Sequence, residues 1–262
     1  MKAKKSLGQH FLTSQKALAD IVGAGDIHTD DVVLEIGPGK GVLTEKLMYL
    51  ADKVIAVEKD TELIPLLQEK FHEAIEKERL EILPRDILKF NPEILRFYKK
   101  PYKLIANIPY YITGAIIEQF LSTSYQPSLM VLLIQKEVAD RIVARDGKQS
   151  VLSIAVSVYG VPKIISKVPA GAFTPPPKVD SAIILIETIS RSFFKDTDER
   201  LFFNVLKACF GKKRKQIVGS LTDFTGERIK ARTALQIAQI AESERPENLS
   251  KEDWKRLVKA LS

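Results

Sequence analysis

A glycine-rich turn between an apolar segment and a helical pattern constrains this chain more than any other feature. The apolar segment covers residues 32–36, the turn reads Gly37-Pro38-Gly39-Lys40-Gly41, and residues 42–47 have helical spacing. Glycine carries no side chain, so a ligand can approach its backbone closely. A strand, a glycine-rich turn and a helix together form the nucleotide-binding unit of α/β folds. The sequence therefore predicts a nucleotide-like ligand here, and the alternative is a tight turn before a helix.

Further apolar segments alternate with helical patterns, which predicts a mostly parallel, doubly wound α/β sheet. Strands are expected over residues 53–57, 80–83, 103–106, 128–134, 163–168 and 179–187, and helices over residues 14–22, 61–74, 137–144 and 150–159. The segment 128–134 is almost continuously apolar, as expected of a strand that is buried on both faces.

Acidic residues come at the ends of successive predicted strands. Glu58 follows the glycine-rich turn by about twenty residues, where an acid that binds ribose hydroxyls is expected. Asp86 follows the next strand, and Glu35 lies in the first. Because parallel strands end at one edge of the sheet, ligand binding is favoured for Glu58 and Asp86 over a role as strand-end caps.

The stretch Asn107-Ile108-Pro109-Tyr110 lies between the predicted strand 103–106 and a helical pattern that begins at Thr113. Its amide oxygen and carbonyls can accept hydrogen bonds from an exocyclic amine, and the tyrosine ring can stack on a flat base. The alternative is a structural turn in which Asn caps, Pro stiffens the backbone and Tyr packs.

Two ligands fit the glycine-rich turn: a dinucleotide for hydride transfer and S-adenosylmethionine for methyl transfer. The dinucleotide fingerprint places its third glycine where this chain has Val42, which favours methyl transfer. Acceptors that hold both N–H groups of an aromatic amine localise its lone pair, and alignment then does most of the catalytic work. No general base is assigned to His10, His28 or His72, and no metal is expected.

Residues 190–262 show only helical patterns, so we expect an α/β domain over 1–189 and a small helical domain over 190–262. The second segment has 16 Lys and Arg residues against 10 Asp and Glu residues, which is nearly all of the net charge of +7. The densest run, Lys212-Lys213-Arg214-Lys215, suits contacts with RNA phosphates, and a solvated surface is the alternative.

A loop over residues 170–178 contains three consecutive prolines, which prevent regular strand pairing. Phe173 in this loop can either stack on a base or anchor the loop in the core, and the sequence leaves both open. The single cysteine, Cys209, fits a reducing compartment. No segment looks like a signal peptide or a membrane span, so we expect a soluble, cytoplasmic protein, and nothing requires more than a monomer.

Four motifs, taken in order along the chain, resemble the KsgA/Dim family of ribosomal RNA adenine dimethyltransferases. They are Gly8-Gln9-His10-Phe11-Leu12, Glu35-Ile36-Gly37-Pro38-Gly39, Asn107-Ile108-Pro109-Tyr110 and the segment from Phe173 to Ser181. The resemblance implies a Rossmann-like class I methyltransferase domain followed by a helical C-terminal domain. It also implies S-adenosylmethionine-dependent N6,N6-dimethylation of two adjacent adenosines in the 3′-terminal hairpin of 16S ribosomal RNA, during assembly of the 30S subunit.

The resemblance also implies roles for individual residues. His10 and Leu12 would border the methionine end of the cofactor, Gly37 would approach it through the backbone, Glu58 would bind the ribose, and Asp86 the adenine amine. Asn107, at the boundary of cofactor and substrate, would bind the target N6 with the Ile108 carbonyl, and Tyr110 and Phe173 would sandwich the target base. The residue after Tyr110 is often Asn in this family but is Tyr111 here, so which tyrosine faces the base stays open, with Tyr110 preferred.

Two alternatives remain at the level of the sequence. The Erm type of methyltransferase acts on large-subunit RNA and shares the Asn-Ile-Pro-Tyr stretch, although the segment 176–181 and the basic run look more like KsgA. An RNA-binding assembly factor without activity is the second, and the intact Gly37, Glu58, Asp86 and Asn107 argue against it.

Overall fold

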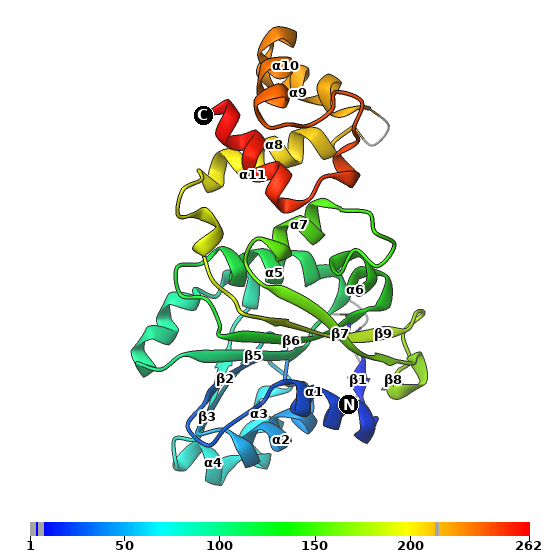
Figure 1. Cartoon of the computed structure of the whole chain (residues 1–262). Coiled ribbons are helices and arrows are strands. Elements are labelled where there is room, and N and C mark those ends of the chain that lie inside the picture. Colours follow the sequence, from blue (N-terminus) through cyan, green and yellow to red (C-terminus); the bar gives the residue numbers. More distant parts are fainter. Residues whose placement is uncertain (1–3, 5–7, 213–214) are drawn as a thin grey trace. The chain divides into compact units, whose positions relative to one another are not determined.

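The computed structural model describes residue 4, residues 8–212 and residues 215–262 (Figure 1). Contacts divide the chain into two compact units: residues 1–139 with 161–189, and residues 140–160 with 190–262. The sequence placed a single boundary after residue 189, whereas the contacts group segment 140–160 with the C-terminal helices. The reason is that helix α7, Val151–Ser157, contacts helix α8, Glu199–Phe210, of that unit.

A seven-stranded sheet in the order β4-β3-β2-β5-β6-β9-β7 forms the centre of the α/β unit. Its strands are β2 Val32–Ile36, β3 Lys53–Glu58, β4 Leu80–Pro84, β5 Tyr102–Asn107, β6 Leu129–Gln135, β7 Val161–Val168 and β9 Ser181–Glu187. Neighbouring strands from β4 to β6 pair in parallel, and β9 pairs antiparallel with both β6 and β7. The mostly parallel α/β sheet expected from the sequence is thus confirmed.

Helices cover both faces of this sheet (Figure 1). Helices α1 to α4 lie below the sheet in this view, and α5 lies above it. Their bounds are α1 Gln15–Ala24, α2 Val42–Leu50, α3 Ile64–Lys70, α4 His72–Glu76 and α5 Thr113–Ser122, while α6 covers Lys136–Ile142. All five residues of β2 are buried, as are the central residues of β6, because helices and neighbouring strands exclude water from both sides.

The predicted helix over residues 61–74 is split at Phe71, which separates α3 from α4. The Phe71 ring lies under Gly41 of the glycine-rich turn: a Cβ placed on Gly41 would be 2.5 Å from Phe71 Cε2. The break therefore lets an aromatic ring fill the space beneath the turn.

A second, two-stranded sheet pairs β1, Phe11–Leu12, with β8, Phe173–Thr174, in antiparallel fashion. Strand pairing was not expected in the proline-rich loop. The structure corrects that expectation for Phe173 and Thr174, which can pair because they precede the first proline. Next to this pairing, the Thr13 amide donates to the Ala172 carbonyl at 2.8 Å. The N-terminal motif is thereby joined to the segment before β9.

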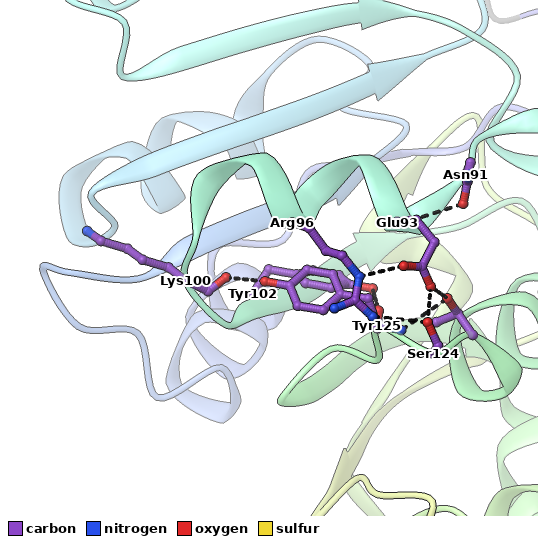
Figure 2. Close-up of polar contacts among 8 residues, drawn as sticks. Asn91, Glu93, Arg96, Lys100, Tyr102, Ser124 and Tyr125 are labelled. Atoms are coloured by element: carbon purple, nitrogen blue, oxygen red, sulfur yellow. Dashed lines mark hydrogen bonds and ion pairs between the residues drawn. The ribbon is translucent and has the colours of Figure 1, made fainter.

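A polar network anchors the 3-10 segment η3, Pro92–Tyr98, to the loop after α5 (Figure 2). The Glu93 carboxylate accepts hydrogen bonds from Arg96 and from the hydroxyls of Thr123 and Ser124. Hydrogen bonds from Ser124 and Arg96 lower the pKa of Glu93 to about 2. The Arg96 guanidinium also lies 4.7 Å from the centroid of the Tyr125 ring. This network is on the periphery of the unit and is separate from the cavity described below.

The second unit is helical in the part of residues 190–262 that the structure describes. Its helices after α8 are α9 Ile217–Thr225, α10 Arg228–Ile237 and α11 Lys251–Leu261. Phe202, Cys209 and Trp254 are completely buried in this unit. Gly226 ends α9 with a φ of +76°, a left-handed conformation that glycine adopts without steric cost. In the described residues no helix has the length and apolar character needed to span a membrane.

Candidate active site

A cavity opens at the C-terminal ends of the parallel strands β2, β3, β4 and β5. Residues that line it include Gly8, His10, Leu12, Glu35, Gly37, Glu58, Asp86, Asn107, Ile108, Tyr110 and Tyr111. Nearly every residue that the sequence assigned to the cofactor and the target base is therefore brought to one place. Among the described residues, Phe173, Lys212 and Lys215 are not part of this lining.

The glycine-rich turn uses positive φ angles at alternate positions. Gly37, Gly39 and Gly41 have φ values of +67°, +60° and +74°. Residues that carry a side chain rarely adopt these angles. A Cβ on Gly37 would lie in ordinary van der Waals contact with the Asn107 carbonyl oxygen, at 3.9 Å. The absence of a side chain at Gly37 thus leaves room for a ligand against the backbone.

Glu58 is held by backbone amides at the end of β3. One carboxylate oxygen accepts from the Gly39 amide at 3.1 Å, and the other accepts from the Asp60 amide at 2.8 Å. Burial raises the pKa of Glu58, and the backbone hydrogen bonds oppose this effect. The carboxylate is fixed in position, and its remaining lone pairs can accept hydrogen bonds from a ligand.

Asp60 fastens the N-terminal segment to the rim of the cavity, a role that the sequence reasoning missed. Its carboxylate accepts from Lys4 Nζ at 2.7 Å and from Gln9 Nε2 at 2.8 Å, and its side chain is 2% exposed. Burial acts to raise the pKa of Asp60, but the hydrogen bonds from Lys4 and Gln9 outweigh it and the pKa is lowered. A second acid two residues beyond Glu58 was the signal available in the sequence.

Asp86 lies on the same rim, half-buried, with two interactions. Its carboxylate caps the following 3-10 turn by accepting from the Leu88 amide at 3.1 Å. Its other oxygen is 2.8 Å from Lys59 Nζ, and this ion pair lowers the pKa of Asp86. Asp86 is therefore an anionic acceptor at the edge of the cavity, as its place after β4 predicted.

Asn107 points its carboxamide toward the N-terminal motif. Its Nδ2 donates to the His10 carbonyl at 3.2 Å, so the amide oxygen is the atom of this group that can accept from a ligand, and Asn107 lines the cavity. The His10 ring is fixed as well, because Nδ1 lies 2.8 Å from the Pro175 carbonyl and must carry a proton to donate to it. Two segments that are far apart in the sequence thus orient the amide.

The aromatic residues expected to contact a base lie in three different environments. Tyr110 is half-buried; its hydroxyl shares a hydrogen bond of 2.6 Å with Ser181, and its ring is stacked on His10 at 6.0 Å. Tyr111 is 63% exposed. Phe173 is 3% exposed, belongs to the hydrophobic core cluster and is not among the residues that line the cavity.

Glu35 is the most deeply buried acid of the cavity lining, at 1% exposure. Burial raises the pKa of Glu35 to about 8. Its Oε2 atom has no hydrogen-bond partner among the described residues. A buried carboxyl oxygen without a partner, at the base of a glycine-rich turn, fits a ligand that brings a hydrogen-bonding group.

In the C-terminal unit, the predicted phosphate-binding run is only partly described. Lys213 and Arg214 lie outside the described residues. Lys212 forms an ion pair with Asp223, and Lys215 Nζ is 3.4 Å from the same carboxylate. Both lysines remain about half exposed, so they can still reach a polyanion.

Comparisons with known proteins cover the full chain. Residues 1–262 match the family described as ribosomal RNA adenine dimethylase. Ribosomal RNA small subunit methyltransferase A of Dehalococcoides mccartyi is 44% identical over 258 residues, which cover 98% of this chain and 88% of the relative. The protein of the same name from Alkaliphilus metalliredigens is 40% identical over 265 residues, with 98% and 91% covered.

Two solved structures share the whole fold. A dimethyladenosine transferase from Plasmodium falciparum has a TM-score of 0.79 and 28% identity, over 95% of this chain and 96% of that chain. The 23S rRNA methyltransferase ErmE has a TM-score of 0.74 and 27% identity, over 96% and 99%.

Proposed function

The chain belongs to the ribosomal RNA adenine dimethylase family, and on this basis we propose that it dimethylates N6 of two adjacent adenosines in the 3′-terminal hairpin of small-subunit ribosomal RNA. It is a class I methyltransferase, and its methyl donor is S-adenosylmethionine. The relatives named for the small subunit are 37–44% identical to this chain, whereas the large-subunit enzyme ErmE is 27% identical. This difference favours the small subunit.

The cavity fits the cofactor through groups that the protein already holds in place. When bound, S-adenosylmethionine supplies a methyl group that its sulfonium has activated. We assign the ribose hydroxyls to Glu58, the adenine amine to Asp86 and the methionine end to His10 and Leu12. The bare backbone at Gly37 and the buried, unpaired Oε2 of Glu35 support this assignment.

Asn107 is the residue that we assign to the acceptor amine. Its free amide oxygen and the Ile108 carbonyl would accept hydrogen bonds from the two N–H groups of adenine N6. The lone pair of an aromatic amine is delocalised into the ring, so two acceptors that draw the nitrogen toward tetrahedral geometry make it a better nucleophile. The face of the Tyr110 ring would hold the base, and with Phe173 in the core the stacking falls to Tyr110.

The observation that carries this proposal is the side chain of Asn107, oriented by the His10 carbonyl within the cavity that holds Glu58 and Asp86. Asn107→Ala should lower kcat by orders of magnitude while the Kd for S-adenosylmethionine stays nearly unchanged, as measured by methyl transfer and by calorimetry. Asn91→Ala, which removes an amide outside the cavity, serves as the control. A large loss of cofactor binding in Asn107→Ala would assign the amide to the cofactor instead.

Radiolabelled S-adenosylmethionine distinguishes the possible substrates. Label should enter the RNA of unmethylated 30S particles and not that of 50S particles or naked large-subunit RNA. Label in large-subunit RNA alone would identify an Erm-type enzyme, and no label anywhere would identify an RNA-binding assembly factor. We also propose that the protein acts as a monomer in the cytoplasm, on a 30S assembly intermediate.

A further inference from the structure

We propose that Tyr111 is a stacking platform at the mouth of the cavity for the nucleobase that neighbours the target adenosine. The proposal rests on the proposed function, because it requires an RNA substrate whose target base enters the cavity. Tyr110 would contact the target base, whereas Tyr111 would contact the base next to it. The proposed role of Tyr111 is in binding the RNA and not in binding the cofactor.

The local backbone sends the two tyrosines in different directions. Residues Tyr110–Ile112 form a 3-10 turn, in which successive side chains point about 120° apart. Tyr110 points inward to its hydrogen bond with Ser181, and Ile112 is 9% exposed. Tyr111 is left facing outward, at 63% exposure, while it still lines the cavity.

The N-terminal motif supports the outward ring. A Cβ placed on Gly8 would lie 3.3 Å from Tyr111 Cε1 and 3.4 Å from Tyr111 Cδ1, so the ring rests against bare backbone at Gly8. Gly8 has a φ of +61°, which any other residue adopts only with strain. One side of the ring is therefore held against Gly8, and most of its surface stays open to solvent.

A base that enters the cavity has to leave the stack of its neighbours. This costs free energy, and enzymes that act on a base recover part of it through aromatic side chains. Every nucleobase has a flat face, so an exposed ring at the mouth can restack the neighbouring base without reading its identity. Isolated surface aromatics are common, and Tyr49, at 81% exposure, is one outside the cavity lining. The position of Tyr111 beside Tyr110 and Asn107 is what distinguishes it.

The test compares methyl transfer to unmethylated 30S particles by the wild type and by Tyr111→Ala, Tyr111→Phe and Tyr49→Ala. Tyr111→Ala should lower kcat/KM for the particles roughly 5- to 150-fold, the range expected for one base stacked on an aromatic ring. The Kd for S-adenosylmethionine should not change. Tyr111→Phe keeps the ring, and Tyr49→Ala removes a ring that is even more exposed but lies outside the cavity lining, so both should match the wild type.

A second measurement identifies the occupant of the platform. In a transcript of the 3′-terminal hairpin with an abasic site next to the target adenosine, wild type and Tyr111→Ala should have equal kcat/KM, because no base remains to stack. A lower kcat/KM of Tyr111→Ala than of the wild type on the abasic RNA would overturn the proposal. So would equal kcat/KM values of the two enzymes on intact particles. A wild type that labels no small-subunit RNA would overturn the proposed function and the platform with it.

Discussion

Replacing Glu35 by Gln should remove a large part of the pH dependence of folding stability. Burial raises the pKa of Glu35 from 4.5 to about 8 in the folded protein, while the unfolded chain keeps the ordinary value. Between these two pKa values the folded state holds a proton that the unfolded state has released. Ionisation therefore favours the unfolded state, and the free energy of unfolding falls as the pH rises through this window.

The magnitude follows from the two pKa values. For an unfolded pKa of 4.5 and a folded pKa of about 8, the loss between about pH 5 and about pH 8 is roughly 3 to 4 kcal/mol. Glutamine does not ionise, so Glu35→Gln should lose none of this. At about pH 5 the variant can be less stable than the wild type, because its NH2 group adds a buried donor that costs about 1–3 kcal/mol if unpaired. The quantity to measure is therefore the difference in free energy of unfolding between the wild type and Glu35→Gln, and how that difference changes with pH.

Urea unfolding at both pH values, followed by far-UV circular dichroism, measures this difference. The only tryptophan, Trp254, is buried in the C-terminal unit, so its fluorescence reports on that unit and should show little effect of the substitution. Glu69→Gln, a change at an exposed position of α3, controls for the general effect of removing a carboxylate. Wild type and Glu35→Gln curves that stay parallel, within about 1 kcal/mol, from about pH 5 to about pH 8 would refute the reasoning.

Three further predictions follow from the packing and the charges. Gly41→Ala should destabilise the α/β unit by more than the roughly 1–2 kcal/mol of left-handed strain, because its Cβ would meet an aromatic ring at 2.5 Å. Gly226→Ala has the same strain with nothing within 4 Å, so its cost in urea unfolding should be the strain alone. Phe173→Ala should cost about 3–5 kcal/mol of stability, as for a core aromatic, and an unchanged unfolding midpoint would place this ring outside the core. Replacing Lys212 and Lys215 by Ala should weaken RNA binding and flatten its slope against log salt by about 1–2, whereas an unaltered slope would show them to be merely solvated.

The strands and the rim of the cavity could be predicted because they follow from local patterns. The alternation of apolar segments with helical ones specifies a parallel sheet, and strand ends then bring Glu58, Asp86 and Asn107 to one edge. Each of these inferences needs only the residues next to it and the geometry of a βα unit.

Features that depend on pairs of residues far apart in the chain could not be predicted. The burial of Phe173 depends on its pairing with Leu12 in the small second sheet, and no residue near Phe173 in the sequence indicates that partner. The clamp at Asp60 depends on Lys4 and Gln9, more than fifty residues earlier. The split of the predicted helix at Phe71 is set by the space beneath Gly41, which exists only once the turn has formed.

The clamp at Asp60 also bears on how the protein should be handled. The Lys4 ammonium and the Gln9 amide donate to the same carboxylate, and Gln9 lines the cavity. A substitution or chemical label at Lys4 or Gln9 would therefore act on the cavity itself, because it would remove one of the two side-chain donors that hold this segment to Asp60.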